Sequence, residues 1–300
     1  MNDLNIIAVI ISFNPKLDLL TKEYESIVHQ VDGIIYIDNN SRNKDDVELW
    51  SNKREKVDLI KLNNNYGIGV AQNAGIKKAL ACGASHIIIF DQDSVINEGF
   101  VESLLRAEEK ALGDGIKVGL TGPVYRSYDD YAYPVWSVEE SKLVRIPQEG
   151  IRDYRMVTHI IASGSLIRRE TLLKVGLMRE DLFLGYIDFE YCFRAAEYGY
   201  KTIVTRHACM RHQMGDKQIL IHGRKIGLYS PFRRYFDCRN TILIQRDKLF
   251  PKSLKRYYLK LIFGKVIISL FYGPKRWKQL QYCLCGFFDG IRGKAGECSI

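Results

Sequence analysis

Short apolar runs alternate with amphipathic stretches along the first ninety residues, and this alternation constrains the possible folds more than any other feature of the sequence. Apolar runs of strand length separated by helical patterns are typical of a parallel sheet that helices cover on both faces. We therefore predict an α/β fold with a mixed, mainly parallel sheet flanked by helices. The predicted strands are 6–11, 33–37, 56–62 and 86–90, and the predicted helices run up to about His29 and from about 66 to 81.

Polar loops follow three of these strands at the points where the strands end. They begin at Ser12, Asp38 and Asp91. Ligands of open α/β sheets collect outside the carboxyl ends of the strands, so we predict one binding site at this edge. The first strand is not followed by Gly-x-Gly-x-x-Gly, and Gly-x-x-x-x-Gly-Lys-Ser/Thr does not occur in the sequence. The sequence therefore lacks the main motifs that would identify a dinucleotide-binding or a P-loop protein.

The triplet Asp91-Gln92-Asp93 directly follows the strand 86–90 and is the candidate centre of that site. Two carboxylates one residue apart raise each other's pKa unless a cation compensates their charge. Carboxylate oxygens suit Mg²⁺ or Mn²⁺, and Mg²⁺ commonly shares one or two carboxylates with the phosphates of a substrate. The alternative is a turn in which acidic side chains form capping hydrogen bonds. The spacing alone leaves both interpretations open.

Acidic residues also interrupt the aromatic and apolar stretch 185–196. Partial burial would raise the pKa of Asp188 or Glu190 toward that of a useful general base. The alternative is a helix start, where both carboxylates favour the positive end of the helix dipole. A further candidate is His212, although a single histidine is more often structural or merely exposed.

Charge divides the chain into two parts. Residues 201–300 contain 21 Lys and Arg against 5 Asp and Glu, a net charge of +16, whereas the first two hundred residues carry a net charge of −7. Aliphatic and aromatic residues lie between the lysines of 257–272, which favours an anionic membrane surface over nucleic acid as the partner. This run is too short and too charged to be predicted as a membrane-spanning helix. A buried packing helix with snorkelling lysines is the alternative.

The remaining features concern the compartment and the boundary between regions. The first five residues contain no basic n-region, so we predict no signal peptide and expect a cytoplasmic protein. The seven cysteines are odd in number and scattered, which indicates free thiols. We place a boundary between residues 1–215, which hold the predicted sheet and site, and a basic, amphipathic helical region, 216–300.

Five short motifs follow one another along the chain, and in this order they resemble those of family-two glycosyltransferases of the GT-A fold. The motifs are Ser12-Phe13-Asn14-Pro15, Asp38-Asn39-Asn40-Ser41, residues 65–75, Asp91-Gln92-Asp93-Ser94 and residues 186–190. Within the family the chain is most similar to bacterial rhamnosyltransferases, and the resemblance covers about the first 250 residues. Arg239-Asn240 resembles a segment after the core in that group. The chain departs from the family pattern at Gly185 and Tyr191, where an aspartate and a tryptophan are usual.

The resemblance implies a role for each motif. Asp38 matches the aspartate that reads the nucleobase, and Asp188 matches the catalytic base. Asp91 and Asp93 match the metal and ribose-diphosphate contacts, and His212 matches a histidine near the same metal. The other residues implied on the donor side are Ser12, Asn14, Asn40, Asn65, Gly67, Asn73, Gly75 and Gln92, and those on the acceptor side are Ser163, Gly164, Tyr186 and Glu190.

The resemblance further implies an inverting transferase that depends on Mg²⁺ or Mn²⁺. It would transfer L-rhamnose from dTDP-L-rhamnose to a hydroxyl of a growing, lipid-linked saccharide in bacterial cell-surface polysaccharide synthesis, such as O-antigen or cell wall. With the basic C-terminal region, this predicts a cytoplasmic enzyme that is peripheral on the inner face of the cell membrane and has no nucleic-acid partner. Three alternatives remain: a UDP-sugar donor, a nucleotidyltransferase, and a non-enzymatic binder of nucleic acid or membrane.

Overall fold

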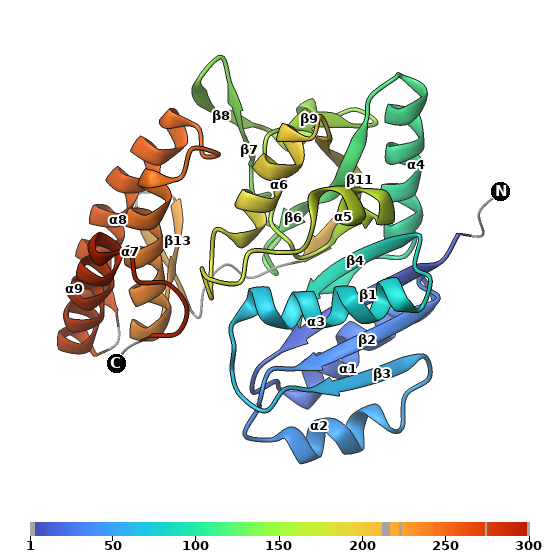
Figure 1. Ribbon diagram of the computed structural model, residues 1–300, viewed down its shortest axis with the longest axis horizontal. Helices are drawn as coiled ribbons and strands as arrows, with labels where there is room; N and C mark the ends of the chain where they lie inside the picture. The colour runs from blue at the N-terminus through green and yellow to red at the C-terminus, as the bar shows by residue number, and fades with distance from the viewer. Residues whose placement is uncertain (1–3, 212–216, 222–223, 274, 299–300) are drawn as a thin grey trace.

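A nine-stranded sheet forms the centre of the computed structural model, which describes residues 4–211, 217–221, 224–273 and 275–298 (Figure 1). Its strands are β1 (Ile6–Ser12), β2 (Gly33–Asp38), β3 (Val57–Lys61), β4 (His86–Asp91), β5 (Val95–Ile96), β6 (Val118–Arg126), β9 (Arg155–Val157), β10 (Ser165–Arg168) and β11 (Lys201–Arg211). Their order is β3-β2-β1-β4-β10-β6-β11-β5, with β9 paired to β11. β1 to β4 pair in parallel, whereas β10 runs antiparallel between β4 and β6.

Helices cover both faces of the sheet because successive residues of β1 point to opposite sides. Ile7 and Val9 share a core cluster with α3, α5 and α6. Ile6 and Ile10 share another with α1, α2 and α4. Both faces are apolar, which is why β1 has a continuous apolar sequence. The helices are α1 (Leu17–Ile27), α2 (Lys44–Ser51), α3 (Ile68–Ala81), α4 (Phe100–Gly113), α5 (Arg169–Val175) and α6 (Ile187–Glu197).

The predicted fold class is confirmed, and each of the four predicted strands is present within one residue at either end. The helix α2 was not predicted, since only Val47 and Trp50 give it apolar buried positions. α3 begins at Ile68, two residues later than predicted, and Gly67 occupies its N-cap position. Cys82, Cys192, Cys209, Cys238, Cys283 and Cys285 are free thiols, as predicted.

A separate hairpin of β7 (Val135–Glu139) and β8 (Lys142–Ile146) projects from the core. A 3-10 turn follows it at Gln148–Gly150. The Trp136 ring of this hairpin lies 6.0 Å from the Tyr257 ring, centroid to centroid. The hairpin therefore touches the region that follows the core.

Residues 217–298 form the C-terminal region, which stands beside the core in Figure 1. It begins with the antiparallel strands β12 (Lys217–Ile221) and β13 (Arg224–Leu228). The prediction of a wholly helical region from residue 216 is therefore wrong for its first part. The helices start only where Ser230 and Pro231 supply an N-cap and a first-turn proline. They are α7 (Pro231–Arg246), α8 (Lys252–Tyr272) and α9 (Arg276–Arg292).

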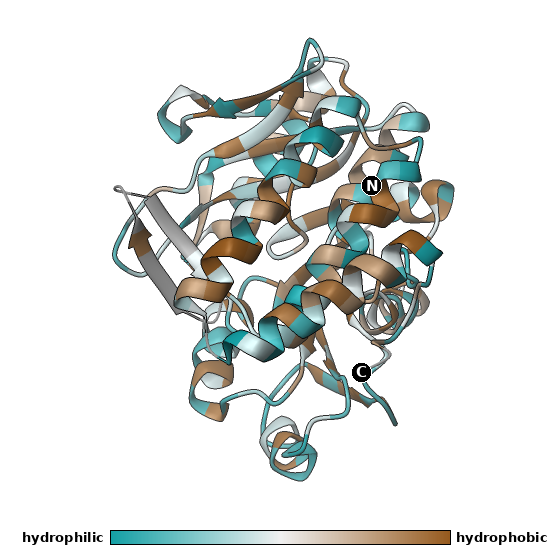
Figure 2. Cartoon of the chain, turned by 90° about the vertical axis from the view of Figure 1, so that its left-hand side faces the viewer, coloured by the Kyte–Doolittle hydropathy of each residue, from teal (hydrophilic) through white to brown (hydrophobic). Residues whose placement is uncertain are grey.

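The outer surface of α8 and α9 exposes large apolar side chains between basic ones. Figure 2, which faces this side, shows hydrophobic segments along the helices there. The exposed apolar residues of the two helices are Phe263, Ile267, Phe271, Tyr272, Trp277, Leu284, Phe287, Phe288 and Ile291. Among the helices of the described residues, none has both the length and the hydropathy that crossing a membrane requires.

Buried polar side chains on the inner surface of α7 form hydrogen bonds with the core. Arg239 and Asn240 are fully buried. The Arg239 guanidinium donates to the Leu182 carbonyl (2.8 Å), and the Asn240 amide donates to the carbonyls of Leu182 (2.9 Å) and Leu184 (2.8 Å). These carbonyls belong to the loop 181–185, which directly precedes Tyr186 and α6. The C-terminal region therefore fixes the chain segment that leads into Asp188.

Candidate active site

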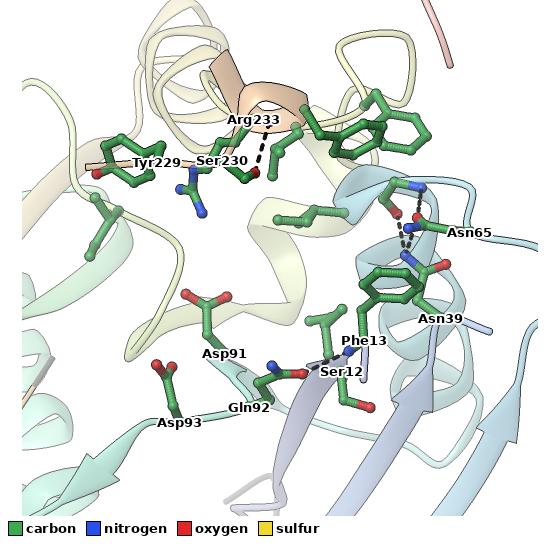
Figure 3. Close-up of a pocket in the computed structure, with 17 residues that line it drawn as sticks. Ser12, Phe13, Asn39, Asn65, Asp91, Gln92, Asp93, Tyr229, Ser230 and Arg233 are labelled. Carbon is green, nitrogen blue, oxygen red and sulfur yellow. Dashed lines mark hydrogen bonds between the residues drawn. The ribbon is translucent and has the colours of Figure 1, made fainter. Parts of the chain in front are cut away.

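A cavity of about 570 Å³ opens at the carboxyl ends of β1 and β4, where the sequence predicts a site (Figure 3). Its described lining comes from the ends of β1 and β4 and the loops at the strand ends, the start of α3, the segment before β10, the loop 181–185 and the C-terminal region. The lining residues are Ile11, Ser12, Phe13, Asn39, Asn65, Gly67, Ile68, Asp91, Gln92, Asp93, Ile161, Phe183, Leu184, Tyr229, Ser230, Phe232 and Arg233.

The loop after β4 carries Asp91, Gln92 and Asp93 on the cavity wall. Backbone and side-chain contacts hold it in place. The Asp91 N–H donates to Ser163 Oγ (3.1 Å), and Gln92 Oε1 accepts the Phe13 N–H (2.7 Å). Ser163 Oγ also lies 2.8 Å from Ser94 Oγ. The loop that carries the two carboxylates is therefore hydrogen-bonded on one side to the residue after β1 and on the other to the segment before β10.

The carboxylates of Asp91 and Asp93 fit a divalent cation that is shared with a substrate phosphate. They supply the hard oxygen ligands that Mg²⁺ and Mn²⁺ prefer, and one or two carboxylates are the usual protein share of such a site. Within the described residues, no group of three or more His, Cys, Asp and Glu side chains is placed to hold a metal by itself. His212, the third predicted ligand, lies outside the described residues.

A second corner of the cavity joins the loop after β2 to the start of α3. Asn39 Nδ2 donates to Asn65 Oδ1 (3.0 Å), which also accepts the Gly67 N–H (3.1 Å). Gly67 has φ = +86°, and a Cβ added there would lie 2.5 Å from the Phe183 carbonyl oxygen. Only glycine therefore suits this position without strain. The Ile68 N–H donates to the same carbonyl (2.7 Å), which ties the loop 181–185 to α3.

Asp188 lies near Asp91 but outside the described lining of the cavity. It borders a small internal void of about 10 Å³, which Ile161 and Ala162 also line. Burial raises the pKa of the Asp188 carboxyl to about 6, and the negative charge of Asp91 adds to that rise. Hydrogen bonds from the N–H groups of Phe189 and Ala162 act in the opposite direction. A carboxyl with this pKa is mostly ionised at neutral pH and can accept a proton.

The donor-side residues fall into two groups. Ser12, Asn65, Gly67 and Gln92 line the cavity together with Asp91 and Asp93. Asp38, Asn14 and Asn40 lie outside the described lining. Asp38 is buried, and one of its oxygens accepts the Ser41 N–H (3.1 Å). Asn14 Oδ1 accepts the Arg42 N–H (2.8 Å), and Asn40 adopts a left-handed backbone with φ = 64°.

Asn73 and Gly75 of α3 face the protein interior rather than the cavity. Asn73 exchanges hydrogen bonds with the backbone of Met178 (2.8 and 2.9 Å) and also donates to Glu180. A Cβ at Gly75 would overlap Val9 of β1. These residues therefore set the position of α3 against the sheet and the loop before α6.

The four acceptor-side residues also contact protein groups. Ser163 orients the Asp91 backbone, and Gly164, at φ = +78°, packs against Pro123. The Tyr186 hydroxyl lies 2.8 Å from Thr241 Oγ1 of α7. Glu190 is buried and pairs with Arg194 (2.8 Å), whose guanidinium also donates to two carbonyls before α6.

Sequence reasoning did not identify the cavity wall that the C-terminal region supplies. Tyr229, Ser230 and Arg233 face the β4 loop across the cavity in Figure 3, and Phe232 also lines the cavity. Their local signal in the sequence is the Ser-Pro helix start at Ser230, which places the first turn of a helix but not its partner. Asn39 lies in a predicted motif but was not a candidate residue, and nothing in the sequence indicated that Phe183 and Leu184 reach the cavity.

Comparison with known proteins decides the family. The sequence model of the family described as "Glycosyl transferase family 2" matches residues 7–176, more than half of the chain. This chain belongs to that family. It is 33% identical over 300 residues to the dTDP-rhamnosyl transferase RfbF of Shigella flexneri, with 97% of both chains covered. It is also 20% identical to the low-salt glycan biosynthesis hexosyltransferase Agl10 of Haloferax volcanii, over 99% of this chain and 94% of that protein.

Solved structures show the same fold in this glycosyltransferase. GalNAc-T7, crystallised with UDP, GalNAc and Mn²⁺, superposes with a TM-score of 0.55 at 16% identity, over 90% of this chain and 58% of that one. S. aureus TarS superposes with a TM-score of 0.52 at 15% identity, over 96% and 49%. The chain thus spans about half the length of these two structures. The GT-A fold and the transferase activity predicted from the motifs are confirmed, and the nucleotidyltransferase and non-enzymatic alternatives are set aside.

Proposed function

We propose that this glycosyltransferase transfers L-rhamnose from dTDP-L-rhamnose to a hydroxyl group of a lipid-linked saccharide, with inversion at the anomeric carbon. The observation that carries the donor assignment is the 33% identity to a dTDP-rhamnosyl transferase over 97% of both chains. This similarity extends beyond residue 176, where the family match ends, through Asp188 and the C-terminal region. It therefore includes both walls of the cavity.

The nucleotide sugar would occupy the cavity with its diphosphate beside Asp91 and Asp93. These carboxylates would hold Mg²⁺ or Mn²⁺, which when bound neutralises charge on the departing nucleoside diphosphate. The corner of Asn39, Asn65 and Gly67 presents amide and backbone groups that suit the nucleoside end. Anchoring of the β4 loop by Ser163 and Gln92 keeps the carboxylates in position before the substrate binds.

Asp188 would act as the general base of a single displacement. Its carboxylate accepts the proton of the acceptor hydroxyl while that oxygen forms a bond to the anomeric carbon. The bond between the anomeric carbon and the diphosphate oxygen breaks, and its electron pair leaves with the nucleoside diphosphate. Ile161 lines both the cavity and the void at Asp188. The proposal therefore requires Ile161 to move when the acceptor binds.

The outer surface of α8 and α9 supports the proposed acceptor and location. α8 contains no Asp or Glu. Lys260 and Lys265 lie on either side of the exposed Phe263, and the exposed Ile267 and Phe271 follow them. Trp277, at the start of α9, is 84% exposed. Apolar side chains set among basic ones suit the interface of an anionic membrane. We propose that this surface holds a cytoplasmic enzyme on the inner face of the cell membrane, near a lipid-linked acceptor.

Nucleotide-sugar binding tests the donor assignment. Thermal stabilisation of the purified protein is measured with dTDP-rhamnose, UDP-glucose and UDP-GalNAc, each with and without Mn²⁺. We expect the largest shift with dTDP-rhamnose and Mn²⁺, because bound ligand stabilises the native state by mass action. A larger shift with a UDP-sugar would replace the donor while leaving the family assignment unchanged. Equal shifts with and without Mn²⁺ would contradict the cation at Asp91 and Asp93.

A further inference from the structure

The wall of the cavity that faces Asp91 and Asp93 is built by the first turn of α7, and it carries a cationic side chain. We propose that Arg233 binds the diphosphate of the nucleotide sugar from the side opposite the two carboxylates. The proposal rests on the nucleotide-sugar donor proposed above and adds a binding residue from the C-terminal region. Among the described residues that line the cavity, Arg233 is the only Lys, Arg or His.

Local contacts fix the direction in which Arg233 extends. Ser230 caps α7, and its Oγ accepts the Arg233 N–H (3.3 Å). The Arg233 guanidinium lies over the Tyr229 ring, with its central carbon 4.8 Å from the ring centroid. Figure 3 shows the guanidinium beside that ring and directed toward Asp91. An aromatic ring supports one face of a guanidinium and leaves its in-plane N–H donors available for an anion.

The neighbouring arginine shows what a structural role looks like at this place in the fold. Arg234 is 1% exposed and pairs with Asp237 of the same helix (2.8 Å). Arg233 is exposed, and the ion pairs described for the chain do not include one between it and Asp91. The space between the guanidinium and the β4 loop is part of the 570 Å³ cavity. It therefore has room for a ligand between opposite charges.

A diphosphate is the ligand that satisfies both sides of this space. A cation on Asp91 and Asp93 would coordinate some of its oxygens, and the planar fork of Arg233 matches the geometry of the others. Negative charge grows on the diphosphate as the sugar departs, and a fixed donor at that position stabilises it. A neutral sugar or a nucleobase would leave the Arg233 charge uncompensated.

Calorimetric titration of dTDP, dTMP and thymidine with Mn²⁺ present tests the proposal. Arg233→Met keeps an apolar stem on Tyr229 but removes the charge. We expect its affinity for dTDP to fall roughly 10- to 100-fold, which is typical for loss of a hydrogen bond to a charged group. Its affinity for thymidine should stay unchanged. Arg233→Lys should retain part of the dTDP affinity, because it keeps the charge without the fork.

Arg256→Met is the matched control, since Arg256 is an exposed arginine of α8 outside the described cavity lining. It should bind all three ligands as the wild type does. Wild-type affinity for dTDP in Arg233→Met, or equal losses for dTDP and thymidine, would overturn the role of Arg233 alone. A wild-type protein that does not bind dTDP in the presence of Mn²⁺ would overturn the proposed donor as well. Melting temperatures of the free variants exclude misfolding as the cause.

Discussion

The two walls of the cavity are built by different means. The wall from the core presents Asp91, Gln92 and Asn39 at the ends of parallel strands, and hydrogen bonds between adjacent loops hold them. The wall from the C-terminal region belongs to a helix that is attached to the core by the buried Arg239 and Asn240. Strand ends position ligands through the sheet itself, whereas the helix is held by buried polar contacts together with packing of Phe236 on Phe183 of the core.

This difference separates the functions that the two regions serve. The core wall carries the candidate chemistry, so changes there should act on rate and on metal-dependent binding. The C-terminal region has an inner surface that completes the site and an outer surface of exposed aromatic residues. Changes at its inner surface should act on stability and binding together, and changes at its outer surface should leave catalysis in solution intact.

The largest effect is expected at Asp188. Asp188→Asn removes the proposed base but keeps its size, so kcat should fall by a factor on the order of 10²–10⁴. The affinity for dTDP should stay within about twofold, since Asp188 lies outside the described cavity lining. Transfer is followed by release of dTDP, and binding by calorimetry. Asp153→Asn, at an exposed carboxylate that pairs with Lys110, is the control and should retain the wild-type rate.

The pH dependence of the wild-type rate sharpens the same assignment. Burial raises the pKa of Asp188 to about 6, so the base is ionised above that pH and protonated below it. The transfer rate should be level near pH 8 and fall about tenfold for each pH unit well below 6. A rate that stayed constant down to pH 5 would show that another group accepts the proton.

The next largest effect is expected at Asp93, because the core wall is the one where ligand binding should depend on a metal ion. Asp93→Ala should weaken dTDP binding in the presence of Mn²⁺ by at least roughly tenfold, because one of the two carboxylates is lost. Without Mn²⁺, the variant and the wild type should bind dTDP alike. If the variant kept its full response to Mn²⁺, the cation would not be held by this loop.

The sequence predicted the core wall far better than the opposite one. The strand before Asp91 is recognisable because a buried parallel strand is apolar on both faces, and the position of the loop follows from the strand. The wall at Arg233 depends on how α7 packs against the loop 181–185, which local patterns do not encode. Asn73 and Glu190 belong to the predicted motifs, yet their side chains are used in internal hydrogen bonds. A sequence motif therefore identifies residues that matter, but it does not show whether a residue contacts the substrate or stabilises the fold.

A smaller effect is expected when the attachment of α7 is weakened. Asn240→Ala removes the amide donor to the Leu184 carbonyl and leaves the Leu182 carbonyl with Arg239, which should lower the free energy of unfolding by about 1–3 kcal/mol. Because Leu184 lines the cavity, dTDP affinity should fall as well. Urea unfolding measures the first effect and calorimetry the second. Asn52→Ala, at an exposed position after α2, should change neither, and an unaltered Asn240→Ala midpoint would contradict the role of this contact.

The smallest effect is expected on the outer surface, at Trp277. Trp277→Ser should reduce binding to phosphatidylglycerol vesicles roughly 3- to 10-fold, since one aromatic side chain buries only part of its area at the interface. Transfer to a soluble acceptor should not change, because Trp277 is 84% exposed and lies outside the described cavity lining. Leu173→Ser, on the exposed side of α5, is the matched control and should sediment with vesicles as the wild type does. Equal binding of the wild type to neutral phosphatidylcholine vesicles would mean that the basic residues do not contribute. Unchanged sedimentation of Trp277→Ser would contradict a contribution of Trp277 to membrane binding.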